Sequence, residues 1–322
     1  MVRGISLRSS DLEWRLDRTM VECASSLIGM VALIAIAAGV GQEDPLVAAL
    51  PGNTTERAAA VQAGPAGARA TATHRDVLAG GYLGVTHTHP SIVTIKNPGR
   101  TDMTVGPIAW EGKPFKSPIY YGARISSWPA HSPIGTMLDF THAKAISRFE
   151  DTANFSGTLE GKPLPPQARL GDMFKHLEFS HGHNMLTGNV LMRLGNFRVQ
   201  PYVGAGAGIS LPHTEIAFRG ENGRTYEYQY AGLAGQVLAG LEVKLGGASL
   251  FVEYKLSYAP YDVPLSGVVN GWLLFTDLWR QFRAWVAREV PPGGRLTTPL
   301  LSHHAIGGAM IKVTRPAMAS PQ

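Results

Sequence analysis

Two neighbouring stretches decide the fold, LAGQVLAGLEVK (233–244) and LFVEYKLSY (250–258). In both, apolar side chains alternate with polar or charged ones, which is the period of two that is typical of a β-strand. One face of the second stretch is apolar and aromatic, whereas the other carries Glu253 and Lys255. In a soluble sandwich such charges face water, but in a membrane barrel the apolar face meets lipid and the charges point into the lumen.

The lengths of the gaps between such stretches favour the barrel. We expect eight strands, at 80–97, 117–127, 133–146, 174–194, 199–212, 226–246, 248–260 and 300–314. Long and short gaps alternate between them, as they do between the outer loops and inner turns of outer-membrane barrels. The sequence therefore predicts an all-β, eight-stranded antiparallel transmembrane β-barrel of outer-membrane type, with both termini at the short turns. The alternative is a soluble lipocalin-like barrel, whose interior would be apolar rather than charged.

The sequence before these strands is typical of an exported protein. An apolar run, LIGMVALIAIAAGV (27–40), follows several arginines and is shorter than the roughly 20 residues that cross a bilayer as a helix. It predicts a signal peptide over 1–40, with an uncleaved signal-anchor helix as the alternative. We expect an Ala/Gly/Pro/Thr-rich linker over 41–79, a barrel over 80–315 and a tail over 316–322. The predicted location is the outer membrane, with the long loops facing outward.

Composition excludes several functional classes. The 322 residues include 44% hydrophobic residues, 16% charged residues and one cysteine, which argues against a disordered chain and against a disulfide scaffold. With 29 Lys+Arg and 24 Asp+Glu, the net charge of +5 is too small to indicate a nucleic-acid partner. The glycines of VGAGAGIS (203–210) are not followed by a helix, so they predict no NAD or flavin site. No protein partner is expected.

Histidines and carboxylates gather at the predicted long-loop rim. They are His142, His176, Glu178, His181, His183, His213 and Glu215. Imidazole and carboxylate together suit a divalent transition metal, although some of these histidines could simply form hydrogen bonds at a polar interface. In an extended strand His181 and His183 share one face, and His176 and Glu178 share the opposite one unless Gly182 marks a bulge.

Two further features concern the lumen and the last long loop. Five charged residues fall on predicted inward faces: Arg124, Glu242, Lys244, Glu253 and Lys255. They predict either an ion path or a salt-bridged plug, and we favour the plug because buried charges must be paired. In the last loop, aromatic residues recur every three or four positions from Trp272 to Trp285. This pattern predicts an amphipathic helix, either at the membrane interface or as a lid over the barrel mouth.

Several stretches together resemble the bacterial outer-membrane lipid A oxidases. They are TDMTV (101–105), PFKSPIYYGAR (114–124), GTMLDFTHAKA (135–145), HLEFSHGHN (176–184), PYVGAGAGISLPHTE (201–215) and LFTDLWRQ (274–281). The resemblance implies oxidation of the proximal glucosamine of lipid A to 2-aminogluconate, with molecular oxygen as co-substrate, after the 1-phosphate has been removed. It implies lipid A, or lipopolysaccharide, as the partner.

The resemblance assigns no catalytic residues, so we place them by hypothesis. His142, the candidate base, is expected to be catalytic together with His176 and Glu178. His181 and His183 are expected to bind a divalent transition metal, for which His176 and Glu178 are further candidate ligands. Lys144, Lys175, His213 and Glu215 are expected to bind substrate. The alternative function is a non-catalytic barrel with a structural or lipopolysaccharide-binding role. The charged residues in the lumen argue against a third possibility, a narrow channel.

Overall fold

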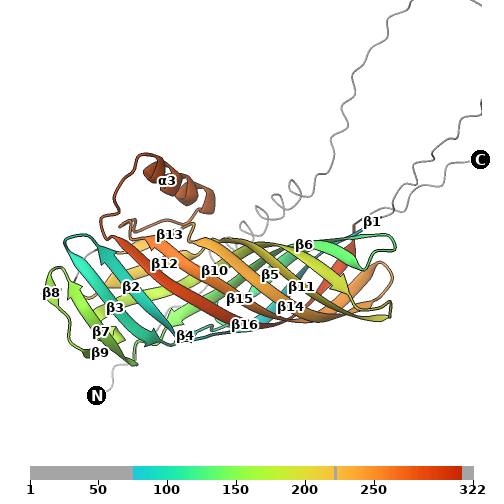
Figure 1. Ribbon diagram of the computed structural model, residues 1–322, viewed down its shortest axis with the longest axis horizontal. Coiled ribbons are helices and arrows are strands. Elements are labelled where there is room, and N and C mark those ends of the chain that lie inside the picture. The colour runs from blue at the N-terminus through green and yellow to red at the C-terminus, as the bar shows by residue number, and fades with distance from the viewer. Residues whose placement is uncertain (1–74, 221–222, 314–322) are drawn as a thin grey trace, which may run out of the picture. The chain divides into compact units, whose positions relative to one another are not determined.

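Eight long antiparallel strands close into a barrel. The computed structural model describes residues 75–220 and 223–313, so the predictions for the signal segment and the tail lie outside the described residues. The strands are β1 (Arg75–Thr88), β5 (Tyr121–Pro129), β6 (Ile134–Ser147), β10 (Phe174–Arg193), β11 (Val199–Ser210), β14 (Gly232–Lys244), β15 (Ala248–Pro264) and β16 (Arg295–Lys312). Each pairs with the next, and β16 also pairs with β1, which closes the ring (Figure 1). This confirms the predicted eight-stranded antiparallel barrel.

One end of the barrel has short turns, and the other carries additional structure. The long connections hold β2 (Ser91–Asn97), β3 (Thr101–Ile108), β4 (Trp110–Glu111), β7 (Thr152–Leu159), β8 (Lys162–Pro163), β9 (Gln167–Arg169), α2 (Leu170–Met173), β12 (His213–Phe218), β13 (Thr225–Tyr228) and α3 (Leu274–Val286). These elements extend the wall beyond the barrel ring. The helix predicted in the last long loop is confirmed as α3. No helix of the described part of the chain is long and apolar enough to cross a membrane.

Several predicted boundaries need correction. The predicted strand 80–97 is two strands, β1 and β2, which are separated at His89 and Pro90; proline has no N–H with which to continue a strand ladder. The predicted strand 226–246 likewise divides into β13 and β14. The region 98–116, predicted as a loop, contains β3 and β4, and β1 begins at Arg75 within the predicted linker.

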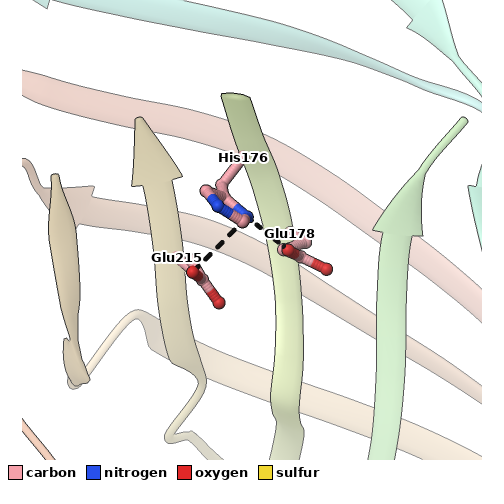
Figure 2. Close-up of side chains that lie close together, drawn as sticks. All are labelled: His176, Glu178 and Glu215. Carbon is pink, nitrogen blue, oxygen red and sulfur yellow. Dashed lines mark hydrogen bonds and ion pairs between the residues drawn. The ribbon is translucent and has the colours of Figure 1, made fainter. Parts of the chain in front are cut away.

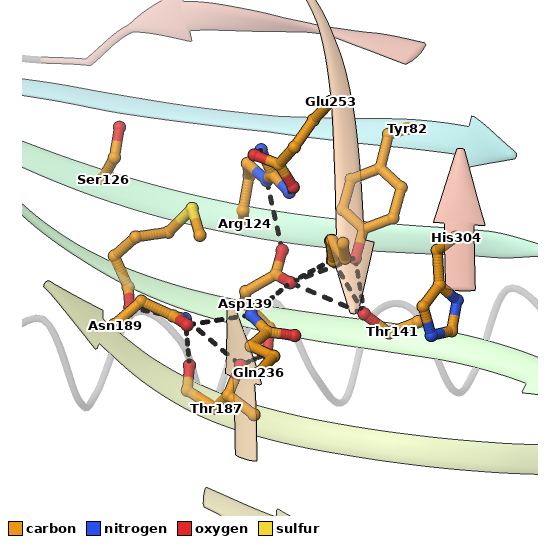
Figure 3. Close-up of polar contacts among 12 residues, drawn as sticks. Tyr82, Arg124, Ser126, Asp139, Thr141, Thr187, Asn189, Gln236, Glu253 and His304 are labelled. Carbon is orange, nitrogen blue, oxygen red and sulfur yellow. Dashed lines mark hydrogen bonds and ion pairs between the residues drawn. The ribbon is translucent and has the colours of Figure 1, made fainter. Parts of the chain in front are cut away.

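A network of paired charges fills the barrel ring (Figure 3). Arg124 Nε donates to Asp139 Oδ1 (3.1 Å), and Arg124 Nη2 donates to Glu253 Oε1 (2.8 Å). Lys255 Nζ forms an ion pair with Asp139 and donates to Tyr82 Oη (2.8 Å). Each buried charge thus has an opposite charge beside it, which is the arrangement that burial requires. These contacts agree with a salt-bridged plug for Arg124, Glu253 and Lys255. Of the other two predicted lumen charges, Glu242 pairs with Arg193 (3.0 Å), and Lys244 hydrogen-bonds Asn196 and Gln200 with no ion pair in the described part of the chain.

The outer surface of the ring is an apolar belt. Leu233, for example, is 68% exposed and points away from the lumen. The belt comprises exposed side chains of six strands: Leu83, Val85, Val190, Met192, Val199, Leu233, Val237, Leu241, Leu250, Val252, Tyr254 and Ile311. A charged interior inside an apolar exterior reverses the arrangement of a soluble barrel and matches that of an outer-membrane β-barrel. The chain therefore has the fold of an outer-membrane barrel rather than a lipocalin.

Beyond the belt, the interior of the extended wall is an apolar core. It takes side chains from strands all around the wall, including Ile95, Val105, Phe179, Tyr261 and Leu296. This core identifies the inward face of each strand that contributes to it. Because side chains alternate across a strand, it also identifies the outward face.

Candidate functional site

Three predicted site residues, His176 and Glu178 of β10 and Glu215 of β12, point outward. Leu177 and Phe179 lie in the apolar core, so the alternate residues His176 and Glu178 face outward. On β12, Ile216 lies in the core. Glu215 therefore faces outward as well, directly opposite Glu178 in the strand register.

Strand β6 also contributes predicted site residues to the outward face, and the register of β10 places this face relative to the belt. Ala143 and Ala145 belong to the inner clusters, so His142 and Lys144 share the outward face. The segment of β10 at 176–183 lies beyond Met185–Arg193, the segment that pairs with β11 and carries part of the belt. The site is thus on the outer wall just beyond the membrane-spanning segments.

Three of these side chains form a compact group, which we call the outer-face cluster: His176, Glu178 and Glu215 (Figure 2). His176 Nδ1 lies 2.9 Å from Glu178 Oε1 and 3.4 Å from Glu215 Oε1. One ligand atom from each residue lies within 4.8 Å of the others. One imidazole and two carboxylates on two paired strands are a suitable ligand set for a divalent transition metal.

Further side chains surround the cluster. Arg224 Nη1 donates to Glu215 Oε1 (3.2 Å), and His181 Nδ1 lies 4.0 Å from Glu215 Oε2. The rings of His181 and Trp272 lie 5.4 Å apart in an edge-on arrangement. Arg224 and Trp272 were not predicted as site residues, because only the tertiary fold brings their loops to β10 and β12.

His213 is buried beside the cluster, on the same face of β12 as Glu215. Its Nε2–H donates to the carbonyl oxygen of Gly271 (2.9 Å), and its Nδ1 has no hydrogen-bond partner among the described residues. Burial lowers the pKa of His213 to about 3, so the ring is neutral at pH 7. His213 therefore offers a free acceptor nitrogen beside His181, whose ring is 5.1 Å away.

A bulge at Gly182 separates the two histidines that were expected to bind metal together. The register between β10 and β6 shifts between Phe179 and His183, and Gly182 has a φ of +145°. His181 stays on the outer face, whereas His183 points inward and hydrogen-bonds the hydroxyl of Tyr261 through Nδ1. His183 is thus not brought to the outer-face cluster, and Gly182 is a bulge of the kind that the sequence analysis considered.

Gly182→Ala is expected to destabilise the barrel by about 1–3 kcal/mol. An added Cβ would meet the side-chain amide of Asn184 at 2.3 Å, at a φ that residues with a Cβ rarely adopt. The free energy of unfolding in urea would measure the cost. Gly161→Ala, also at positive φ (+73°) but with open space around it, is the control for backbone strain alone. An equal cost for the two variants would contradict this role of the contact with Asn184.

The remaining predicted residues lie on the same wall or at its edge. Asn184 Nδ2 donates to the carbonyl of Leu211 (3.1 Å), which turns Asn184 Oδ1 toward His142 Nδ1 (2.7 Å). The His142 ring stacks on Tyr121, and its Nε2 is buried without a partner among the described residues. Lys144 Nζ donates to the carbonyl of Lys116 (2.6 Å).

Lys175 lies at a second register shift, between Phe174 and His176, and is exposed. His142, Lys144 and Lys175 are therefore neighbours of the outer-face cluster along the wall, but the structure does not make them part of it.

The affinity of the cluster for Zn²⁺ is expected to fall as the pH is lowered from about 8 to about 5, because metal ligands must be deprotonated. Burial raises the pKa of Glu215, and Glu178 raises it further, while His176 and Arg224 oppose the shift. Acid therefore protonates Glu215 at a higher pH than an exposed glutamate. Calorimetric titration across this range would measure the effect, and Glu215→Gln should flatten the pH dependence. An affinity independent of pH would contradict the assignment of Glu215 as a ligand.

Comparisons with known proteins give only distant structural similarity. No protein-family model matches the chain, and no curated protein matches it. The solved structure of Neisserial surface protein A (NspA) is 11% identical, with a TM-score of 0.31. The outer membrane protein OprG from Pseudomonas aeruginosa is 11% identical, with a TM-score of 0.37. Each match covers 74% of this chain and 96% of the other. The barrel fold of this chain follows from its own strand pairing and apolar belt.

Proposed function

We propose that this protein is an outer-membrane enzyme that modifies lipid A, and that it oxidises the proximal glucosamine to 2-aminogluconate. The observation that carries the proposal is the position of the outer-face cluster. His176, Glu178 and Glu215 lie on the outer wall, just beyond an apolar belt. In a bilayer this is the level of the polar headgroups, so a lipid headgroup can reach the cluster sideways from the membrane. The long loops then face outward, toward the leaflet that contains lipid A.

The reaction balances with oxygen as the acceptor. The anomeric hydroxyl loses its proton and the carbon that bears it loses a hydrogen with two electrons, so the hemiacetal becomes a lactone. The two electrons and two protons reduce O₂ to hydrogen peroxide. Water then opens the lactone to the 2-aminogluconate carboxylate, and the lipid has gained one oxygen atom.

The side chains at the outer-face cluster have two proposed roles, which are metal binding and proton transfer. His176, Glu178 and Glu215 would hold the divalent transition metal, which would supply Lewis-acid and redox chemistry when bound. His181, beside Glu215 and partly exposed, is positioned to accept the anomeric proton, the role expected of His142 from the sequence. Arg224 orients Glu215 through their ion pair.

The resemblance of the histidine-bearing stretches to lipid A oxidases supports this choice of reaction. The same stretches, HLEFSHGHN (176–184) and SLPHTE (210–215), supply the cluster and its surroundings. Lys144 and Lys175, on and beside the same wall, are proposed to contact substrate phosphate or carboxylate. His213 is proposed to support His181 through the contact between their rings.

The test uses the purified, folded full chain with lipid A that lacks its 1-phosphate, in water enriched in ¹⁸O. The product should gain one oxygen atom on the proximal sugar, labelled from water because it enters during lactone hydrolysis, and hydrogen peroxide should accumulate in equal amount. An unmodified lipid in the presence of added divalent metal and oxygen would overturn the oxidase proposal. Binding of lipid A without conversion would favour the non-catalytic, lipopolysaccharide-binding alternative.

A further inference from the structure

Helix α3 is attached to the barrel by its polar side. Asp277 Oδ2 accepts from the backbone N–H of Tyr228 (3.2 Å), and its side chain is almost fully buried. Gln281 accepts from the backbone N–H of Tyr230 (2.7 Å) and donates to its carbonyl (3.0 Å). Arg280 Nη1 donates to Glu227 Oε2 (2.7 Å). These contacts fix the helix along the edge of β13.

The apolar side of the same helix is exposed. Phe275 and Trp279 are each 61% exposed, Phe282 is 48% exposed and Trp285 is 75% exposed. A helix of a soluble protein normally buries its apolar stripe and exposes its polar one. The reversed arrangement is typical of a helix at a membrane interface. Figure 1 shows α3 lying along the flank of the barrel, so it is not a lid over the open end.

A groove of about 980 Å³ lies between α3 and the barrel wall. The helix contributes Leu278, Phe282 and Trp285, and the wall contributes Ile209 and Leu211. Ile209 pairs across the strands with Leu233 of the apolar belt. The apolar lining of the groove is therefore continuous with the surface that faces the lipid chains.

The segment just before α3 reaches the surroundings of the outer-face cluster. Trp272, just before α3, contacts the rings of His181 and Tyr226, at 5.4 and 4.7 Å. The rim of the groove carries charges of both signs: Arg288 and Glu289 are adjacent in the chain, Arg280 pairs with Glu227, and Arg295 pairs with Asp262. A molecule held here needs an apolar tail for the groove.

We propose that this groove binds an acyl chain of the outer-leaflet glycolipid and so seats its sugar headgroup at the outer-face cluster. The choice of glycolipid over phospholipid rests on the proposed function. The reversed polarity of α3 and the continuity of the groove with the belt support the groove independently of that function. Trp272 then separates the acyl chain from the cluster and guides the headgroup.

The test is photo-crosslinking of the full chain in proteoliposomes. One probe is lipid A with a diazirine near the end of an acyl chain, and the other is phosphatidylethanolamine with the same chain. Mass spectrometry should place the lipid A label on the groove residues of α3 and β11. Leu278→Trp, which fills the groove, should lower this labelling about tenfold, since overfilling a packed site costs that much or more. Phe275→Trp, on the same helix but outside the groove, should leave it unchanged.

Additional variants and controls distinguish a failure of the groove from a failure of the proposed reaction. Each variant is first checked for the heat-modifiable electrophoretic migration of a folded barrel, and Ile209→Trp fills the groove from the wall if Leu278→Trp does not fold. His176→Ala should keep the groove labelling even though it loses oxidation, so the groove and the reaction can fail separately. Labelling spread evenly around the belt, or unaffected by filling, would overturn the groove. Equal labelling by the phospholipid probe would overturn the assignment to glycolipid.

Discussion

Lys255→Met is expected to destabilise the barrel by about 3–5 kcal/mol, the cost of leaving a buried charge unpaired. Lys255 is fully buried, forms an ion pair with Asp139, and donates to Tyr82 Oη (2.8 Å) and Thr141 Oγ1 (3.0 Å). Without it, Asp139 keeps only Arg124 as a cationic partner, and Arg124 is already paired with Glu253. Two buried carboxylates would then share one guanidinium.

Reversible urea unfolding in lipid vesicles, followed by tryptophan fluorescence, would measure this loss. The double variant Lys255→Met/Asp139→Leu is the matched control, because it removes both members of the pair and leaves Arg124 with Glu253. We expect it to recover most of the lost stability, since apolar replacement of a buried pair is often neutral. A single variant as stable as the parent, or a double variant with the summed cost of both single changes, would contradict the account of the lumen as a charge-paired plug.

His176→Ala is expected to lower both the affinity for Zn²⁺ and the rate of lipid oxidation by more than about 100-fold. Mutation of residues that only support metal ligands already lowers metal affinity or activity by about 10–100-fold, and His176 is itself a proposed ligand. His176 provides the single nitrogen of the outer-face cluster and lies within 3.4 Å of both carboxylates. Its removal leaves two glutamates facing each other across β10 and β12. Zinc titration of the folded variant and rate measurement with lipid A would test the two effects separately.

Two other histidine variants serve as controls for His176→Ala. His87→Ala removes an exposed imidazole from β1, away from the cluster, and should change neither quantity. His183→Ala removes the inward-facing histidine that contacts Tyr261, and it should leave the zinc affinity unchanged even if it lowers stability. Loss of zinc affinity in His183→Ala comparable with that in His176→Ala would show that the inward and outward assignments on β10 are incorrect.

The sequence predicted the ring of strands because membrane barrels impose a strict alternation. In 250–258 every second side chain is apolar, and Glu253 and Lys255 alternate with the exposed Val252 and Tyr254. The pairing of charges in the lumen could be predicted from the same pattern, since buried charges on an inward face need partners. Asp139 was not included among the predicted lumen charges, although it is the partner of both Arg124 and Lys255.

The extended wall and the orientation of the site could not be predicted in the same way. Beyond the belt the interior is apolar, so polar residues such as Glu178 and Glu215 point outward, which reverses the pattern of the membrane-spanning part. If charged residues are assumed to face inward beyond Met185 as well, the cluster is predicted on the wrong face of the wall. The bulge at Gly182 adds a local shift that a simple alternation does not reveal.

The residues from distant segments that surround the outer-face cluster could not be predicted from the sequence pattern either. Arg224 and Trp272 join the surroundings of the cluster from the segments before β13 and before α3. Arg224 stands near no motif, and Trp272 was singled out only as the first residue of the aromatic spacing. For α3, by contrast, the aromatic spacing predicted the helix itself. The choice between lid and interface depended on which side of the helix the barrel holds, and only the contacts of Asp277 and Gln281 reveal that.

Mass spectrometry of lipid A from a host whose lipid A lacks the 1-phosphate, expressing the parent chain, His176→Ala or His87→Ala, measures whether the outer-face cluster oxidises lipid A. We expect one added oxygen atom on the proximal glucosamine with the parent and with His87→Ala, and unmodified lipid A with His176→Ala, all three proteins being folded in the outer membrane. Unmodified lipid A with the folded parent chain, or equal oxidation by His176→Ala, would contradict the claim that the outer-face cluster oxidises lipid A.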